Sequence, residues 1–305
     1  MSEYHEPVML TECIEALQIR PNGVYVDVTF GGGGHSRAIL EQLGEEGRLL
    51  AFDQDADALQ NAIDDPRFTL IHENFRHLKA FLRLNGVRRI DGLLADLGVS
   101  SHQFDEGSRG FTYRQDGPLD LRMDRRQALT AADLVNSLDE PALANLLRLY
   151  GELPNAGAIA RSIVAARKEE PIATTFQLKE AVKRHLPFHQ ENKVLSMIFQ
   201  ALRIEVNGEL EALRQMLSQA VELLGDEGRL VVMSYHSLED RLVKNLMRSG
   251  NFEGNLEKDF FGNPLTPMVP VRRKATIATA EEQERNPRSR SAKLRVASKQ
   301  TIAQL

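Results

Sequence analysis

The chain of 305 residues has little of several features that define other protein classes. Its one cysteine, Cys13, excludes an internal disulfide framework and is typical of a reducing compartment. It has no tryptophan, and no apolar run approaches the roughly 20 residues that a membrane helix needs. Residues 1–7 have no basic stretch followed by an apolar one, so we expect no secretory signal. These absences predict a cytoplasmic protein with no membrane partner.

The chain also has fewer basic than acidic residues. The 38 Lys and Arg residues face 43 Asp and Glu residues, a net charge of −5, which at first disfavours a nucleic-acid partner. The charge is unevenly distributed, however: residues 1–103 carry −7, 104–208 are neutral, 209–271 carry −4 and 272–305 carry +6. This basic C-terminal segment is compatible with an RNA partner, although a solvated tail has the same composition.

Short β-rich segments alternate with helical patterns in the first 103 residues. The expected strands are 24–29, 48–53, 68–72 and 90–96, and the expected helices are 36–42, 56–63 and 78–84. Alternation of helices with apolar strands predicts a mostly parallel sheet covered on both faces. Near the end of the chain we expect helices at 209–224 and 238–247 and strands at 229–234, 275–279 and 293–297.

Only helical patterns occur in the middle of the chain, at 141–149, 156–169, 176–186 and 194–204. We therefore predict an α/β domain formed by residues 1–103 and 208–305. An all-helical domain, residues 104–207, is inserted into it.

A glycine-rich turn joins the first expected strand to its helix. Gly31, Gly33 and Gly34 allow close approach of a ligand to the backbone, and the helix N-terminus adds partial positive charge. Asp53 ends the second strand 20 residues after Gly33, a spacing that suits a carboxylate on the ribose of a nucleotide-like ligand. The alternative is a tight turn with Asp53 as a plain cap.

The turn favours S-adenosylmethionine (SAM) over NAD. A dinucleotide fingerprint has a third glycine where this chain has Ser36. Asp27, just before the turn, provides a carboxylate for the cationic amino group of SAM. Thr29 departs from the acid-x-G-x-G-x-G pattern that is usual for SAM.

Asp96 ends the fourth expected strand, where doubly wound folds place their chemistry. An exocyclic base amine is a weak nucleophile, because its lone pair is delocalised into the ring. An acceptor for its N–H groups localises that lone pair and aims it at a methyl donor. Asp96 is our candidate for this catalytic role. It could instead bind the SAM amino group or act as a structural turn acid.

Several segments together carry a resemblance to a known family. They are Asp27–Ser36, Asp91–Gly92, Asp96–Ser101 with Gln103, Arg109–Phe111, Asp116–Met123, Phe199–Ile204 with Val206–Asn207, Ser234–Arg241 and Asn286–Arg295. In these segments the chain resembles the ribosomal RNA small-subunit methyltransferase H family, also called MraW. The resemblance covers nearly the whole chain. The chain departs from the family pattern at Asn192–Ile198 and Leu153–Gly157, both in the helical insertion.

The resemblance implies a Rossmann-like methyltransferase core with an inserted helical domain. It implies SAM-dependent methylation of the N4 amine of one cytidine in the decoding region of 16S rRNA. The partner would be small-subunit rRNA or the assembling 30S subunit, and a homodimer stays open. The cofactor contacts implied by the family are Gly33, Gly34, His35, Asp53, Phe75, Asp96 and Gln103.

Further polar residues are candidates for substrate contact. In His236–Arg241 we interpret Ser237 as a helix N-cap and Asp240 as its capping-box acid, which leaves His236 as a catalytic candidate and Arg241 as a substrate contact. A charged loop and the basic tail add the candidates Arg109, Asp116, Arg122, Arg288 and Arg290. We expect the loop to close over a flipped-out cytidine; a structural ion-pair network is the alternative.

Two other functions stay open on the sequence. An NAD-dependent oxidoreductase would use the same Gly-rich turn, and a non-catalytic RNA-binding protein would keep the fold alone. We predict no metal site, because Pro187 breaks the helix that would align His185 with His189.

Overall fold

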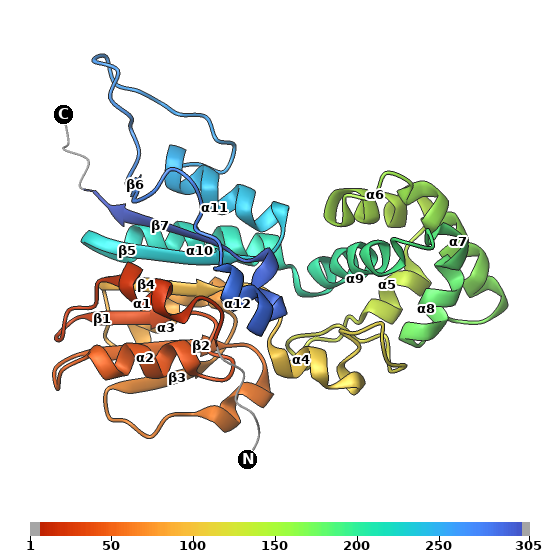
Figure 1. The fold of residues 1–305 in the computed structure, drawn as a ribbon, viewed down its shortest axis with the longest axis horizontal. Coiled ribbons are helices and arrows are strands. Elements are labelled where there is room, and N and C mark those ends of the chain that lie inside the picture. The colour runs from red at the N-terminus through yellow and green to blue at the C-terminus, as the bar shows by residue number, and fades with distance from the viewer. Residues whose placement is uncertain (1–6, 301–305) are drawn as a thin grey trace. The chain divides into compact units, whose positions relative to one another are not determined.

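The computed structural model describes residues 7–300, which divide into two compact units (Figure 1). Unit 1 comprises Met1–Gly98 and Leu210–Leu305, and unit 2 comprises Val99–Glu209. The sequence patterns predicted the end of the first α/β segment at residue 103, five residues after Gly98. They predicted the start of the second segment at residue 208, two residues before Leu210.

Unit 1 is built on one seven-stranded sheet with the strand order β3-β2-β1-β4-β5-β7-β6. Its strands are β1 (Val24–Asp27), β2 (Arg48–Asp53), β3 (Phe68–His72), β4 (Ile90–Asp96), β5 (Leu224–Ser234), β6 (Met268–Pro270) and β7 (Lys293–Lys299). β1 to β5 pair in parallel, and β7 pairs antiparallel with β5 and with β6. The predicted α/β fold with a mostly parallel sheet is confirmed.

Helices cover both faces of the sheet because its central strands are apolar on both sides. Their side chains alternate, so that Val26 faces one core and Tyr25 the other. One core packs against α3 (Leu78–Leu84), α10 (Glu209–Leu223) and α11 (Ser237–Ser249). The other packs against α1 (Leu10–Leu17) and α2 (Gly34–Gln42). The sequence patterns did not predict α1.

Unit 2 is helical and has an apolar core of its own. Its helices are α4 (Ser101–Asp105), α5 (Ala131–Ser137), α6 (Glu140–Gly151), α7 (Ala156–Glu169), α8 (Thr175–Val182) and α9 (Glu191–Asn207), with short 3₁₀ turns at Gly107–Arg109 and Lys183–His185. Buried side chains of α6, α7 and α9, such as Leu147, Ile159 and Leu202, form the centre of that core. Four of the six α-helices of unit 2 begin with a side-chain N-cap, such as Thr130 at α5 and Thr174 at α8.

Two expected elements differ in the structure. The helix expected at 56–63 is a 3₁₀ helix, Ala56–Asn61, which Asp55 caps. The strand expected at 275–279 is wrong: Thr276 makes a single bridge with Leu294, and the β6 strand lies upstream. Ile277 is 64% exposed, so this β-rich composition reflects a surface loop and not a buried strand. Two shorter elements, α12 (Ala280–Arg285) and a 3₁₀ turn at Pro287–Ser291, occupy the expected basic loop.

Within residues 7–300, no helix is long and apolar enough to cross a membrane.

Candidate active site

The carboxyl end of β1 is organised around the buried carboxylate of Asp27, which is 1% exposed. Its Oδ1 accepts the backbone N–H of Thr29 at 3.0 Å, and its Oδ2 accepts the hydroxyl of Ser36 at 2.7 Å. Asp27 therefore ties both ends of the glycine-rich turn together. A buried carboxylate with lone pairs still available is suited to a cationic group as well.

The turn itself is open on the side that a ligand would approach. Gly31 has a φ of 50°, in the left-handed region, and a Cβ built on it would meet no atom within 4 Å. Gly33, with a φ of 78°, is the N-cap of α2, and a Cβ there would clash with the Phe30 ring. These residues fit a nucleoside-type ligand, because the turn leaves room against the backbone at a helix N-terminus.

Asp53, at the end of β2, contacts the same turn. Its Oδ2 accepts the N–H of Gly31 and its Oδ1 accepts the N–H of Asp55, each at 2.8 Å. Burial raises the pKa of Asp53 to about 6, against the lowering effect of these two hydrogen bonds. Each oxygen keeps a second lone pair, so both can also accept a ribose hydroxyl. Because Asp53 forms these hydrogen bonds within the turn, it also has the structural capping role that was the alternative interpretation.

Asp96 lies at the end of β4 and is held from two sides. Its backbone N–H donates to Thr29 Oγ1 at 2.7 Å, and its Oδ1 accepts the hydroxyl of Tyr235 at 2.7 Å. Burial raises the pKa of Asp96 to about 6, while His35 and the Tyr235 hydroxyl partly lower it. The Nδ1 of His35 lies 4.0 Å from Asp96 Oδ2. A carboxylate that is anchored through one oxygen and titrates near neutrality suits acid–base or acceptor chemistry.

His35 and Phe75 complete the predicted contacts in unit 1. His35 is buried, and its Nε2 lies 3.2 Å from the carbonyl oxygen of Val8. Phe75 begins a 3₁₀ turn (Phe75–His77) just after β3 and packs, half-buried, on the main core. Parallel strands bring their carboxyl ends to one edge of the sheet, so Asp27, Asp53 and Asp96 share that edge.

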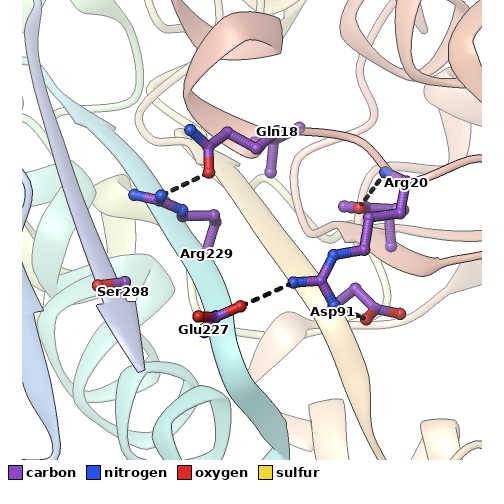
Figure 2. A pocket seen from close by; sticks show the side chains of 8 residues that line it. Gln18, Arg20, Asp91, Glu227, Arg229 and Ser298 are labelled. Atoms are coloured by element: carbon purple, nitrogen blue, oxygen red, sulfur yellow. Dashed lines mark hydrogen bonds and ion pairs between the residues drawn. The ribbon is translucent and has the colours of Figure 1, made fainter. Parts of the chain in front are cut away.

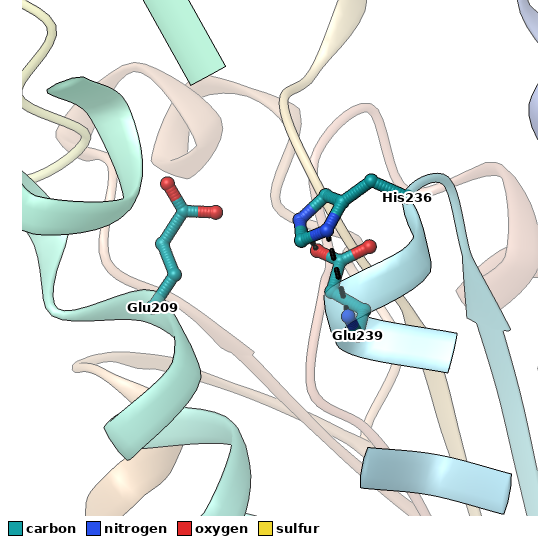
Figure 3. Close-up of side chains that lie close together, drawn as sticks. All are labelled: Glu209, His236 and Glu239. Carbon is teal, nitrogen blue, oxygen red and sulfur yellow. Dashed lines mark hydrogen bonds and ion pairs between the residues drawn. The ribbon is translucent and has the colours of Figure 1, made fainter. Parts of the chain in front are cut away.

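His236 is the N-cap of α11, one residue before the predicted cap (Figure 3). Its Nδ1 accepts the N–H of Glu239, and its Nε2 lies 3.1 Å from a Glu239 carboxylate oxygen. The expectation that Ser237 and Asp240 form the capping pair is wrong. Asp240 instead forms a two-point ion pair with Arg295 of β7, with nitrogen–oxygen distances of 2.6 and 3.2 Å. His236 thus has a structural role, and a catalytic one stays a prediction.

The predicted contacts in unit 2 have local partners. Gln103 is buried and forms a capping box with Ser100 at the start of α4. Arg109 is 1% exposed and donates to the backbone carbonyls of Arg122 and Met123 at 3.1 and 3.2 Å. A side chain held in this core offers nothing to a substrate, so we do not retain Arg109 as a substrate contact.

Asp116 and Arg122 lie nearer the surface of unit 2. The Asp116 carboxylate accepts the N–H of Phe176 at the start of α8, at 3.2 Å. Arg122 donates two hydrogen bonds, of 2.7 and 2.8 Å, to the Asp120 carboxylate. Arg122 therefore belongs to an ion pair, as the alternative interpretation of the loop expected. Asp116 is exposed and accepts a hydrogen bond from the N-terminus of α8.

The remaining candidates for substrate contact differ in exposure. In the basic C-terminal segment, Arg290 is exposed and Arg288 is half-buried, and Arg241 of α11 is exposed. Arg295 is 14% exposed and belongs to the ion pair with Asp240, so it stabilises unit 1.

A pocket at the opposite end of the strands is not the candidate site. Figure 2 shows Arg20 between Asp91 and Glu227, and Arg229 beside Gln18, at the amino ends of β4 and β5. Ligands of open α/β sheets bind at the carboxyl ends. The charges in this pocket neutralise one another, and it is far along the strands from Asp96.

Sequence reasoning missed Thr29 and Tyr235. Thr29 occupies the position of a usual glycine, and its hydroxyl links the β1 turn to the backbone of Asp96. Tyr235 is 139 residues from Asp96 in the sequence. A signal for Thr29 existed in its departure from the glycine pattern, whereas nothing local marks Tyr235 as a partner of Asp96.

The fold and this site define a SAM-dependent methyltransferase: a glycine-rich turn after β1, an acid at the end of β2 and another at the end of β4. Residues 2–300 match the MraW methylase family, and the chain belongs to that family.

The alignments with curated relatives cover almost the full length of both chains. A protein from Parabacteroides distasonis is 56% identical over 297 residues, covering 97% of each chain. One from Bacteroides thetaiotaomicron is 55% identical over 296 residues, again covering 97% of each. Both are named ribosomal RNA small subunit methyltransferase H. Among solved structures, an rRNA methylase from Streptococcus thermophilus is 11% identical with a TM-score of 0.43, covering 96% of this chain and 94% of the other.

Proposed function

We propose that this enzyme methylates the exocyclic N4 amine of one cytidine in small-subunit ribosomal RNA, with SAM as the methyl donor. The names of relatives at 55–56% identity support the RNA substrate. The observation that carries the choice of an amine is the Asp96 carboxylate, which is anchored at the edge of the sheet and able to accept an N–H.

Two carboxylates of unit 1, Asp27 and Asp53, are proposed to bind SAM. Asp27, beside the turn, is placed to attract the amino group of the methionine end of SAM. Asp53 is placed to accept the ribose hydroxyls, and Gly31 leaves open space against the backbone. Gly33, Gly34, His35, Phe75 and Gln103 complete the proposed cofactor contacts.

Asp96 makes the target amine reactive. By accepting an N–H, the carboxylate localises the nitrogen lone pair and orients it for direct in-line attack. When bound, SAM would supply an electrophilic methyl group, whose transfer would form the nitrogen–carbon bond, break the carbon–sulfur bond and leave a thioether. The nitrogen sheds one proton. Asp96 is able to accept that proton, because its pKa of about 6 lies close to neutrality.

RNA binding would involve both units. The exposed side chains of Asp116, Arg241 and Arg290 and the half-buried Arg288 are the retained candidates for substrate contact, with Arg122 orienting its own loop. We propose that the helical unit, Val99–Glu209, recognises the RNA around the target cytidine. The substrate would be rRNA or the assembling 30S subunit.

The test is methyl transfer from labelled SAM to small-subunit rRNA and to 30S subunits, followed by mass spectrometry of the nucleosides. N4-methylcytidine at one position is the expected product, and a strain lacking the protein should lack that modification. Methylation of carbon 5 or of another base would refute the amine assignment. Binding of NAD in place of SAM would support an oxidoreductase, and SAM binding without transfer would support a non-catalytic protein.

Two variants on the same strand sharpen the test. Asp96→Asn should lower the transfer rate by about a thousandfold, within the range for loss of an acid–base group combined with a transition-state contact. Asp91→Asn, at the amino end of β4, should leave transfer unaffected. Asp91 bonds the backbone N–H of Val24, outside the proposed site. Equal rates for both variants would refute the role of Asp96.

A further inference from the structure

Tyr235 is a polar side chain that contacts Asp96 and has no role in the proposed mechanism. It follows β5 directly, and its hydroxyl donates to Asp96 Oδ1 at 2.7 Å. Its backbone N–H donates to a carboxylate oxygen of Glu239 at 3.0 Å, which fixes the start of α11 beneath it. The tyrosine is therefore held by its backbone and bound to Asp96 by its tip.

The Tyr235 ring also packs on the turn that follows Asp96. Gly98 has a φ of 99°, and a Cβ built on it would lie 3.5 Å from a ring carbon of Tyr235. The N–H of Leu97 donates to the carbonyl of Met233, so β4 and β5 stay paired up to this point. Ring and hydroxyl together limit how the end of β4 can move.

These contacts leave Asp96 with one anchored oxygen and one oriented oxygen. The backbone of Asp96 is held by Thr29, and its Oδ1 is held by Tyr235. Its Oδ2 has the ring of His35 at 4.0 Å, beyond hydrogen-bond length. A carboxylate anchored through one oxygen presents the other in a defined direction, which costs less entropy when a ligand N–H binds.

We propose that Tyr235 is a positioning residue for methyl transfer: it holds Oδ1 of Asp96 so that Oδ2 accepts the N–H of the amine to be methylated. This inference rests on the proposed function, because it assumes that Asp96 faces that amine. Tyr235 itself touches neither the methyl group nor the reacting nitrogen. It acts through Asp96 alone.

The Tyr235 hydroxyl has a second effect on Asp96. Burial and the neighbouring Asp96 raise the pKa of Tyr235 well above its usual value, so the hydroxyl keeps its proton and remains a donor. Hydrogen bonding to a carboxylate favours its ionised form. The other ionisable groups acting on Asp96 are His35 of α2, which favours ionisation, and Asp27 of β1 and Glu239 of α11, which oppose it. Cys13 of α1 lies close enough to be affected by the Asp96 charge.

The experiment is the pH dependence of single-turnover methyl transfer at saturating SAM and RNA, with wild type and Tyr235→Phe. Removing the hydroxyl should raise the pKa of Asp96 and move the acidic limb of the profile upward by about one pH unit. On the alkaline plateau, where Asp96 is ionised in both proteins, the rate should fall about tenfold through lost orientation. RNA affinity should stay within about twofold. An unmoved acidic limb would overturn the proposal.

Tyr25→Phe is the matched control. Tyr25 is also buried in unit 1, and its hydroxyl accepts the N–H of Arg20 at 2.8 Å, at the other end of the sheet. Loss of this hydroxyl should lower thermal stability but leave the acidic limb unmoved. A limb that moves equally in both variants would indicate general loosening and would refute positioning by Tyr235.

Asp96→Asn separates this proposal from the proposed function. Full transfer activity in that variant removes the assumed role of Asp96, whatever Tyr235→Phe does. Loss of activity in Asp96→Asn together with a wild-type pH profile in Tyr235→Phe refutes the role of Tyr235 alone.

Discussion

Replacing Asp96 with asparagine should make the ligand-free protein more stable at about pH 8 while it removes activity. Burial raises the pKa of Asp96 from its ordinary 3.8 to about 6, so folding disfavours the ionised carboxylate. Asparagine keeps the shape, and its oxygen can still accept the Tyr235 hydroxyl. The backbone bond from Asp96 to Thr29 involves no side-chain atom of Asp96 and survives the change.

The size of the expected stabilisation follows from the change in pKa on folding. A pKa difference of one between the unfolded and folded states corresponds to about 1.36 kcal/mol, so the change from 3.8 to about 6 limits the gain in unfolding free energy to about 3 kcal/mol. The Asp96 side chain is 24% exposed, and asparagine must desolvate its own amide. We therefore expect a gain of about 1–3 kcal/mol in the free energy of unfolding at about pH 8.

The sign of the pH dependence is the discriminating result. A carboxyl whose pKa is raised on folding adds stability below its unfolded-state pKa, and this stability is lost as the pH rises through the folded-state pKa. The advantage of Asp96→Asn should thus shrink from about pH 6 downward and vanish near pH 4. Urea unfolding followed by far-UV circular dichroism measures it, since the chain has no tryptophan. An advantage that is constant with pH, or a less stable variant at about pH 8, would refute the reasoning.

Three further predictions test the site and its surroundings. Thr29→Val removes the acceptor of the Asp96 N–H and should cost about 1–3 kcal/mol of unfolding free energy by urea titration, whereas Thr29→Ser should restore most of it. Asp53→Asn should weaken SAM binding about tenfold by calorimetry, and unchanged affinity would remove the ribose assignment. Arg290→Gln should reduce the salt dependence of RNA binding, while Arg295→Gln should destabilise the fold by about 3 kcal/mol and leave the salt slope unchanged. A reduced slope for the second variant would show that its guanidinium reaches RNA.

The local parts of the site could be predicted from the sequence. Asp27, the glycines after it and Asp53 follow from strand ends and one short spacing, because a parallel sheet brings its carboxyl ends to one edge. Asp96 follows from the same rule. The strand and helix patterns were strong enough to separate an α/β unit from a helical insertion.

Long-range contacts could not be predicted. Arg109 is a cationic residue in a charged loop, as is typical of a substrate contact, but its side chain is buried in the core of unit 2. Arg295 lies in the basic C-terminal segment, but its side chain forms an ion pair with Asp240. Asp240 matches a capping box in sequence, yet it pairs with Arg295 because β7 runs beside β5. The partner of a charged side chain depends on which strands are neighbours, and a local pattern carries no information about that.

Local sequence patterns are therefore sufficient to predict the class of fold, the glycine-rich turn and the three acids at the ends of β1, β2 and β4. Spacing and periodicity specify these features because they depend on the backbone within a few residues. The groups that act on Asp96, in contrast, depend on the tertiary fold. The hydroxyls of Thr29 and Tyr235 reach it from just beyond β1 and β5, which are far apart in the chain, and burial by the surrounding elements raises its pKa to about 6.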